Sequence, residues 1–278
     1  MNEQAPAPKK SLGQHWLHDQ SVCRRITQLS AAAPNQPILE IGPGAGALTQ
    51  VLLETGARVT ALETDLGAIS FLNEKFEAEI ESGQLRIIEG DGRFFELPSP
   101  ATIPWTVVSN LPYNVGTIIF LNLLNQAEKI ERMVLMFQAE VSQRILAEHG
   151  SKNHGFLSVL TSLEWDKRRG LKVRPGAFKP PPRVQSEVIV LEQAAPGRGW
   201  ANPRDEFRKF VDICFRNRRK MLRNVLTRNG YTDEQVRAGF STCKLTDKTR
   251  AEAIPAILFP ELFHALQEHE TLQIETKG

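Results

Sequence analysis

The chain has 278 residues, of which 41% are hydrophobic and 24% charged, and its formal net charge at pH 7 is +2. These values are ordinary for a soluble globular protein, and the length is sufficient for two domains and a large core. No apolar run approaches the length of a membrane-spanning helix, so the sequence does not favour a membrane protein.

The distribution of charged residues and cysteines along the chain narrows the class of protein further. From Pro196 to the end there are 15 basic and 11 acidic residues, whereas the preceding part has 19 basic and 21 acidic ones. A basic C-terminal part is compatible with a nucleic-acid partner. The widely spaced Cys23, Cys214 and Cys243 predict neither a disulfide framework nor a zinc site. We therefore expect a cytoplasmic protein without a bound metal.

Residues 1–18 are expected to form an N-terminal arm. The first ten residues are polar and lack the apolar segment of a signal peptide. From such an arm Lys9, Lys10 and Trp16 can cover a pocket or touch phosphates. The alternative is a solvated tail in which Trp16 packs locally. The first helix is expected to start near Asp19.

A glycine-rich turn follows the first predicted strand, Pro37–Ile41. The run from Gly42 to Thr49 leads into helical spacing, and its glycines let the backbone approach a ligand closely. Gly42, Gly44 and Ala47 satisfy the dinucleotide fingerprint, whereas the additional Gly46 gives the form usual for S-adenosylmethionine sites. The turn indicates a nucleotide-type site but does not choose between NAD and S-adenosylmethionine.

Acidic residues end the next two predicted strands. Residues 58–62 read as a strand that ends at Glu63, about 20 positions past the glycines, where a carboxylate is placed to bind ribose hydroxyls. Residues 85–91 read as a third strand, which ends in Gly90-Asp91. The Asp91 carboxylate can accept a hydrogen bond from an adenine amino group, although it can also cap a helix.

The fourth predicted strand, residues 105–109, ends in Asn110-Leu111-Pro112-Tyr113. Pro112 prevents the strand from continuing, so an amide, a fixed turn and an aromatic ring are presented together. Carbonyl oxygens beside a stacking ring suit a planar base with an exocyclic amine. A plain turn with Tyr113 in the core is the alternative. Four strand ends in register favour a ligand site at one sheet edge: Gly42, Glu63, Asp91 and Asn110.

The remaining segments complete the sheet and begin a helical part. A composition rich in Ala, Pro, Gly and Asn at residues 194–203 predicts the boundary between a Rossmann-like domain, 19–195, and a helical domain, 196–278. Before this boundary we expect a strand at 133–137 and helices at 140–149 and 156–160; beyond it we expect helices at 206–214 and 221–228.

Two runs of basic residues stand out. The first includes Lys167, Arg168, Arg169, Lys172, Arg174, Lys179 and Arg183, and it surrounds Phe178 and three prolines, which predict a stiff, extended loop. The second includes Arg216, Arg218, Arg219, Lys220, Arg223 and Arg228, with no acidic residue among them. Either run can be a solvated face. For the second run we favour contact with RNA phosphates.

Taken together, these motifs resemble the class I S-adenosylmethionine-dependent adenine N6-methyltransferases, and more closely the ribosomal RNA adenine dimethyltransferase (KsgA/RsmA) family. The resemblance spans nearly the whole chain. It is carried by residues 13–17, 38–49, 63, 91, 110–114, 138–141, 151–159, 177–186 and 218–224. One departure is His15, where the family usually has Asn, which places a cofactor contact at this position in doubt.

The resemblance implies an α/β fold with a mostly parallel seven-stranded sheet and a small all-α C-terminal domain. It implies that the cofactor is S-adenosylmethionine, bound by His15, Leu17, Gly42, Gly44, Glu63, Asp91 and Asn110. It places the target adenine against Asn110, Leu111, Pro112, Tyr113 and Phe178. RNA contacts are expected from Arg216, Arg218, Arg219, Lys220 and Arg223.

The resemblance also implies a reaction and a partner. Methyl groups are expected to pass from S-adenosylmethionine to N6 of two adjacent adenosines near the 3′ end of 16S rRNA, within assembling small ribosomal subunits. We expect a monomer with no metal and no membrane attachment. Three alternatives stay open: a large-subunit rRNA methyltransferase of the macrolide-resistance type, an NAD oxidoreductase, and a non-catalytic RNA-binding assembly factor.

Overall fold

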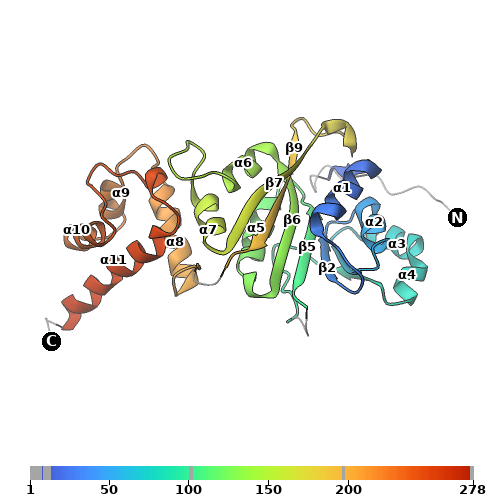
Figure 1. The fold of residues 1–278 in the computed structure, drawn as a ribbon, viewed down its shortest axis with the longest axis horizontal. Helices are drawn as coiled ribbons and strands as arrows, with labels where there is room; N and C mark the ends of the chain where they lie inside the picture. The colour runs from blue at the N-terminus through green and yellow to red at the C-terminus, as the bar shows by residue number, and fades with distance from the viewer. Residues whose placement is uncertain (1–7, 9–13, 100–102, 196–197, 276–278) are drawn as a thin grey trace. The chain divides into compact units, whose positions relative to one another are not determined.

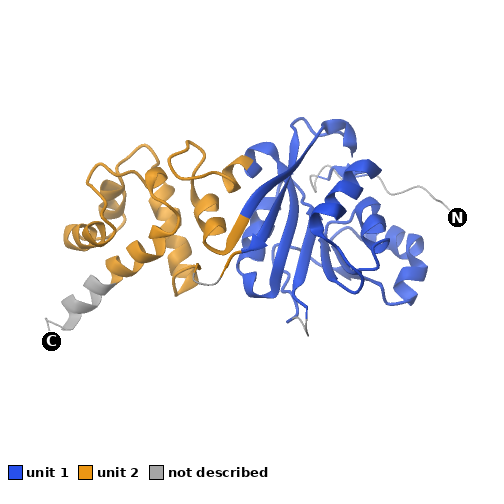
Figure 2. Ribbon diagram, viewed as in Figure 1, with its two compact units in different colours: residues 1–142, 167–193 blue, residues 143–166, 194–278 orange. Residues whose placement is uncertain are grey.

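The computed structural model describes residues 8, 14–99, 103–195 and 198–275, with side chains in the last helix as far as Gln267. The chain divides into two compact units (Figure 2). Unit 1 consists of residues 1–142 and 167–193, and unit 2 of residues 143–166 and 194–278. The predicted boundary near residue 195 is therefore incomplete, because residues 143–166 also belong to unit 2.

Unit 1 is built on a seven-stranded sheet with the strand order β4-β3-β2-β5-β6-β9-β7 (Figure 1). The strands are β2 (Pro37–Ile41), β3 (Arg58–Glu63), β4 (Leu85–Glu89), β5 (Trp105–Asn110), β6 (Ile130–Gln138), β7 (Trp165–Val173) and β9 (Ser186–Gln193). The pairs β2–β3, β3–β4, β2–β5 and β5–β6 are parallel, and β6–β9 is antiparallel. The mostly parallel seven-stranded sheet is as predicted.

The central strands are buried apolar runs, because helices lie on both faces of a parallel sheet. Ile38 and Leu39 of β2 and Val107 and Val108 of β5 are fully buried. The order of the strands reverses at β2, which lies between β3 on one side and β5 on the other. In such sheets a crevice opens at the carboxyl ends of the strands beside this reversal.

The first helix of unit 1 begins after a capping aspartate. Asp19 accepts hydrogen bonds from the main-chain N–H groups of Ser21 and Val22, so it caps the first helix. The helices are α1 (Gln20–Ser30), α2 (Ala47–Leu53), α3 (Leu66–Lys75), α4 (Glu77–Glu81) and α5 (Gly116–Leu124), with 3₁₀ turns η2 (Ala127–Lys129) and η3 (Pro175–Ala177). Helix α6 (Ala139–Ile145) is shorter than predicted and crosses the unit boundary.

A second, two-stranded sheet ties the N-terminal arm to unit 1. Strand β1 (Trp16–Leu17) pairs antiparallel with β8 (Phe178–Lys179), and the N–H of His18 donates to the Ala177 carbonyl at 3.0 Å. The earlier part of the arm, including Lys9 and Lys10, lies outside the described residues. The basic run after residue 166 also differs from the prediction, because most of it forms β7, at the edge of the large sheet.

Unit 2 is helical apart from the first two residues of β7, in agreement with the predicted small all-α part. Its helices are α7 (Phe156–Glu164), α8 (Arg204–Phe215), α9 (Leu222–Arg228), α10 (Asp233–Thr242) and α11 (Leu258–Glu275), with the 3₁₀ turn η4 (Ala251–Ala253). Phe207, Phe210 and Phe263 form its aromatic centre. In the described part of the chain, no helix is long and apolar enough to cross a membrane.

Candidate active site

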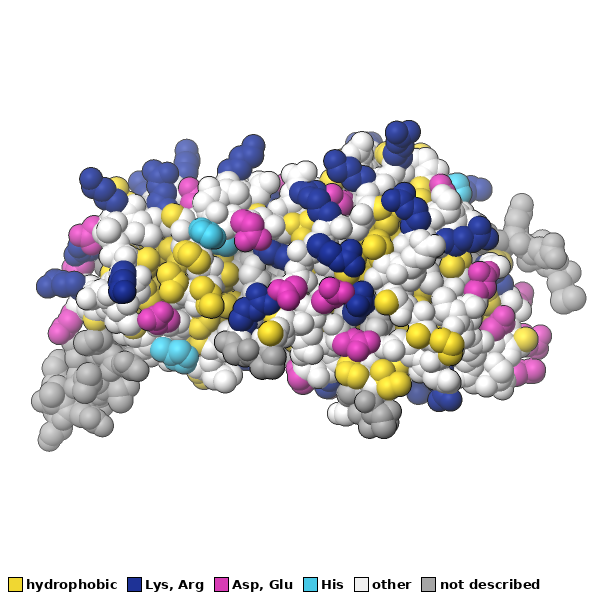
Figure 3. All heavy atoms as spheres, viewed as in Figure 1, with side chains coloured by type: hydrophobic (Ala, Val, Ile, Leu, Met, Phe, Trp, Pro, Cys, Tyr) yellow, Lys and Arg dark blue, Asp and Glu magenta, His cyan; other side chains and the backbone are white. Residues whose placement is uncertain are grey.

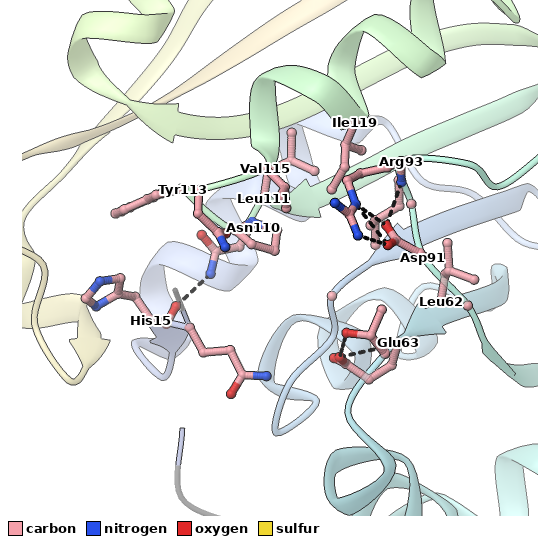
Figure 4. A pocket seen from close by; sticks show the side chains of 18 of the residues that line it. His15, Leu62, Glu63, Asp91, Arg93, Asn110, Leu111, Tyr113, Val115 and Ile119 are labelled. Carbon is pink, nitrogen blue, oxygen red and sulfur yellow. Dashed lines mark hydrogen bonds and ion pairs between the residues drawn. The ribbon is translucent and has the colours of Figure 1, made fainter. Parts of the chain in front are cut away.

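A cavity of about 340 Å³ opens at the carboxyl ends of β2, β3, β4 and β5 (Figure 4). We call it the strand-end pocket. All four residues that the sequence places at one sheet edge line it: Gly42, Glu63, Asp91 and Asn110. Its volume lies in the range of small-molecule sites. The strand ends therefore converge on a single cavity.

The glycine turn leaves room at the base of this pocket. Gly42 has φ +70°, and a Cβ atom added there would approach only the Pro112 ring, at 3.8 Å. Gly44 has φ +56°, and its added Cβ would lie 2.7 Å from Cδ1 of Trp16. Gly44 itself does not line the pocket; Trp16, which covers it, does. Both positions use the left-handed conformation that favours glycine.

The Glu63 carboxylate is held by main-chain donors. It accepts hydrogen bonds from the N–H groups of Gly44 at 3.2 Å, Thr64 at 2.8 Å and Asp65 at 3.0 Å, and the residue is 5% exposed. Thr64 and Asp65 donate to Oε1, whereas Oε2 accepts only from Gly44, so Oε2 keeps an acceptor position for a ligand hydroxyl. The main chain thus fixes this carboxylate in the pocket wall.

Asp91 forms a salt bridge with Arg93 at the same wall. The guanidinium Nε and Nη2 of Arg93 lie 2.9 and 2.6 Å from Oδ2 of Asp91. Hydrogen bonds from Arg93 lower the pKa of Asp91, so its carboxyl group is ionised at neutral pH. Both side chains line the pocket, where an acceptor for an amino group is expected. Arg93 was not predicted as a site residue from the sequence.

Asn110 ends β5 with its amide in a fixed orientation. Its Nδ2 donates to the main-chain carbonyl of His15 at 2.9 Å (Figure 4). Its Oδ1 is buried and has no hydrogen-bond partner among the described residues. A buried carbonyl oxygen without a donor is rare and unfavourable in a folded protein. In a pocket wall, it indicates a donor supplied by a ligand.

Tyr113 lies beside Asn110 and is anchored at both ends. Its hydroxyl is hydrogen-bonded to Oγ of the buried Ser186, and its ring centroid lies 5.3 Å from that of His15 at an interplanar angle of 32°. Burial raises the pKa of Tyr113, so the phenol stays neutral. Figure 4 shows Tyr113 and His15 at one end of the pocket and the Asp91–Arg93 pair at the other.

The arm is the source of further pocket residues. Gln14, His15 and Trp16 line the pocket, and Nδ1 of His15 lies 2.8 Å from the Pro180 carbonyl oxygen. The predicted cofactor residue Leu17 does not line it, because its side chain points into the core and is 6% exposed. Strand alternation explains this outcome, since neighbouring residues of β1 face opposite ways.

Phe178 is also placed in the core rather than at the pocket. Its ring is 2% exposed and packs in the same hydrophobic cluster as Leu17, opposite which it pairs in the β1–β8 sheet. It does not line the strand-end pocket. Leu111, Pro112 and Tyr113, by contrast, do line it. The sequence predicted that the Phe178 ring stacks on the target base, and the burial of this ring in the core corrects that prediction.

The C-terminal arginines are less available than their sequence run suggests. Arg216 pairs with Asp212, and Arg223 with both Asp233 and Asp247. Nη2 of Arg218 donates to the carbonyls of Lys152 and His154, each at 2.6 Å. Acidic residues of unit 2 therefore neutralise part of the run. Arg219 and Lys220 are exposed and form no ion pair with a described residue.

Among the polar and charged side chains that line the pocket, four were not predicted as site residues: Gln14, Thr64, Arg93 and Asn114. Trp16 lines the pocket as one alternative of the prediction had it. A signal for Arg93 existed in Asp91-Gly92-Arg93, because a turn brings side chains two positions apart within reach. Gln14 had no comparable local signal, because the arm is held at the pocket by the β1–β8 pair, whose two strands are distant in sequence. Within the described part of the chain, no group of three or more His, Cys, Asp or Glu residues is arranged to hold a metal ion.

Comparison with known proteins relates this geometry to a family. The family model for ribosomal RNA adenine dimethylase matches residues 7–268. Proteins described as ribosomal RNA small subunit methyltransferase A are 38% identical in Geobacter sulfurreducens and 39% identical in Caulobacter vibrioides. The matches cover 93% and 92% of this chain, and 95% and 96% of those proteins.

Solved structures share the fold. A dimethyladenosine transferase from Plasmodium falciparum has a TM-score of 0.73 at 22% identity and covers 91% of this chain and 98% of its own. The 23S rRNA methyltransferase ErmE has a TM-score of 0.65 at 24% identity, with 91% and 99% covered. At such identities the likeness shows the fold alone. The family model and the curated relatives carry the assignment: the chain belongs to the ribosomal RNA adenine dimethylase family, which dimethylates adenines of ribosomal RNA with S-adenosylmethionine.

Proposed function

We propose that Asn110 and Leu111 accept hydrogen bonds from the N6 amino group of an adenosine in 16S rRNA, and that methylation takes place on this nitrogen. The observation that carries the proposal is the buried Oδ1 of Asn110, which has no donor among the described residues although the amide nitrogen beside it is satisfied. The N6 amino group supplies the missing donors.

The residues of the strand-end pocket fit S-adenosylmethionine. Glu63 offers acceptor capacity for ribose hydroxyls, and Asp91 offers an ionised acceptor for the adenine amino group, once its salt bridge with Arg93 opens or is shared. Gly42 leaves open the space that a Cβ would fill. When bound, the cofactor supplies a methyl group already activated by its sulfonium. No side-chain nucleophile is then required.

The protein's own contribution is to hold and polarise the amine. The lone pair of an adenine amine is delocalised into the ring, so the nitrogen is a poor nucleophile. Hydrogen bonds to Oδ1 of Asn110 and to the Leu111 carbonyl favour a more tetrahedral nitrogen, whose lone pair is available. Tyr113, held by Ser186, offers a fixed ring against which the base stacks. Positioning of the reacting groups accounts for much of the acceleration.

The finer context follows from the family and is part of the same proposal. The targets are two adjacent adenosines near the 3′ end of 16S rRNA, methylated within assembling small ribosomal subunits, so the protein takes part in subunit biogenesis. We further propose that it acts as a monomer in the cytoplasm. Names of the curated relatives, which specify the small subunit, support this choice over the large-subunit alternative.

The decisive experiment replaces Asn110 with alanine. We expect Asn110→Ala to lower methyl transfer to undermethylated small subunits roughly 10²–10³-fold, the range seen when a polarising hydrogen bond is removed. Calorimetry is expected to show S-adenosylmethionine binding within a few-fold of the unchanged protein. Asn73→Ala, at an exposed position of α3, is the matched control and should leave both quantities unchanged. Unchanged turnover in Asn110→Ala would remove Asn110 from the mechanism.

A further inference from the structure

An exposed strip of basic residues follows the edge of the large sheet in unit 1. Strand β7 is the last strand of that sheet, and the η3 turn and β8 continue from it. Lys and Arg side chains gather over β7 and the loop that follows it on the face shown in Figure 3. We define the β7 basic strip by its exposed members: Arg168, Lys172, Arg174, Lys179 and Arg183.

The charges of this strip are not neutralised by the protein. None of its five members forms an ion pair with any residue in the described ranges. Their neighbour Arg169 differs, because it pairs with the buried Glu187 of β9 and so has a structural partner. Lys172 lies between the buried Leu171 and Val173, so its side chain points away from the core. The strip is therefore a positive surface whose charges have no ion-pair partner within the described ranges.

One member of the strip, Lys179, lies next to residues that line the strand-end pocket. Lys179 is the partner of Trp16 in the β1–β8 pair, and the next residue, Pro180, offers its carbonyl to Nδ1 of His15 at 2.8 Å. His15 and Trp16 both line the pocket, and His15 lies at the Tyr113 end. A polyanion bound along the strip would therefore reach the end of the pocket where the target base is proposed to enter.

We propose that the β7 basic strip binds the phosphate backbone of the RNA strand that carries the target adenosine. The inference rests on the proposed function, because it assumes that an adenosine enters beside Tyr113. It assigns the phosphate contacts near the pocket to unit 1. Arg216, Arg218 and Arg223, by contrast, would have to give up bonds to protein acceptors before they could bind phosphates.

The competing explanation is protection of an edge strand. Charged side chains, lysine above all, prevent edge-to-edge pairing of exposed strands. That role accounts for Arg168 and Lys172 within β7. It does not account for Arg174 and Arg183, which lie outside any strand, and it predicts no effect on RNA binding. RNA affinity therefore separates the two explanations.

The test compares two double variants with equal loss of charge. Lys172→Gln/Arg174→Gln removes two charges from the strip. Arg58→Gln/Arg86→Gln is the matched control, because it removes two exposed charges from β3 and from β4, the opposite edge strand of the same sheet. Affinity for undermethylated small subunits and for deproteinised 16S rRNA is measured over a range of salt concentrations, with thermal unfolding as the check on folding.

We expect the strip variant to bind both RNA-containing probes about tenfold or more weakly at 0.1 M salt, and the slope of log affinity against log salt to fall by about 1.5. S-adenosylmethionine binding should not change. If the strip variant misfolds, Lys179→Gln/Arg183→Gln tests the same surface. Equal affinities of strip and control variants would overturn the inference, as would a loss confined to intact subunits, which would indicate a ribosomal protein partner.

Failure of this inference can be told apart from failure of the proposed function. RNA affinity is measured without methyl transfer, so it does not depend on Asn110. Normal turnover in Asn110→Ala together with weakened RNA binding in the strip variant would support RNA binding by the β7 basic strip and contradict the proposed role of Asn110. Lowered turnover in Asn110→Ala together with normal RNA binding in the strip variant would support the role of Asn110 and contradict RNA binding by the strip.

Discussion

At the scale of single residues, unit 1 contains a buried carboxyl group, that of Glu40, which does not line the strand-end pocket. Glu40 is the next-to-last residue of β2 and is 2% exposed, and Oγ1 of Thr49 donates a hydrogen bond to its carboxyl group at 2.6 Å. Burial raises the pKa of Glu40 from 4.5 to about 8. Because the charged form is disfavoured there, the folded protein holds a proton that the unfolded chain releases.

This proton makes stability depend on pH. The contribution of Glu40 to stability is fully present below about pH 4.5 and is lost progressively as the pH rises to about 8, by at most ~1.4 kcal/mol per pH unit. We expect the free energy of unfolding of Glu40→Gln to depend less on pH in this range. Relative to the unchanged protein, it should therefore increase from pH 5 to pH 8. Urea unfolding at both values measures the difference. Parallel pH curves would contradict the assignment.

The position of the strand-end residues at one sheet edge could be predicted from the sequence, but the direction of the side chains in the arm could not. Gly42, Glu63, Asp91 and Asn110 follow strands with strong apolar patterns, so their place at a common edge is a consequence of parallel pairing. Leu17 and Phe178 belong to strands of two residues, which have no pattern of their own. Their burial depends on the tertiary pairing of two distant segments.

At the scale of elements, the start of α2 depends on a glycine held against its neighbours. Gly46 is the N-cap residue with φ +74°, and an added Cβ would lie 2.6 Å from the Phe76 ring and 2.8 Å from Leu72. Gly83 has the same φ but no heavy atom within 4 Å of its added Cβ. The two positions therefore separate backbone strain from crowding.

We expect Gly46→Ala to destabilise the protein by roughly 2–5 kcal/mol, because it combines left-handed strain of about 1–2 kcal/mol with overpacking of about 1–3 kcal/mol. The control Gly83→Ala has the strain alone and should lose about 1–2 kcal/mol. Chemical denaturation of both variants measures the difference. Equal losses would show that Phe76 and Leu72 move aside without penalty.

Among the other elements, those with an apolar sequence pattern were predicted, and one without such a pattern was not. The helix α7 and the strand β6 are clear apolar runs, and both are present. The strand β7 was missed, because its many lysines and arginines resemble a loop when burial is unknown. An edge strand needs to bury only one side, so charged residues are compatible with it.

At the scale of the whole chain, the division into units does not follow the order of the sequence. Helix α7 belongs to the same unit as α8, although most of the sheet strands of unit 1 precede it and β9 follows it. Nε1 of Trp200 donates to the Leu160 carbonyl at 2.9 Å, and Arg204 pairs with Glu164 at 2.6 Å. A composition shift reveals the third crossing of the chain between units, near residue 194, but not the first two, near residues 142 and 166.

A fragment of residues 1–195 tests this division. It keeps α7 but lacks α8, so the α7 surface that packs against α8 is exposed to water. We expect the fragment to unfold at a lower temperature than the full chain and to bind a hydrophobic dye, as measured by differential scanning fluorimetry with the full chain alongside. An unchanged melting temperature would mean that α7 does not depend on α8.

The pairing of β5 with β6, in which Asn110 lies opposite Met136, has a consequence for how the chemistry is maintained. Side chains alternate along a strand, so a slip of one position would bring Ser109 or Leu111 opposite Met136 and turn the carboxamide to the other face of the sheet. Methyl transfer thus depends on the alignment of two buried strands as strictly as on the amide. Insertions in the connecting loops leave that alignment untouched, and it is there that such enzymes are free to diverge.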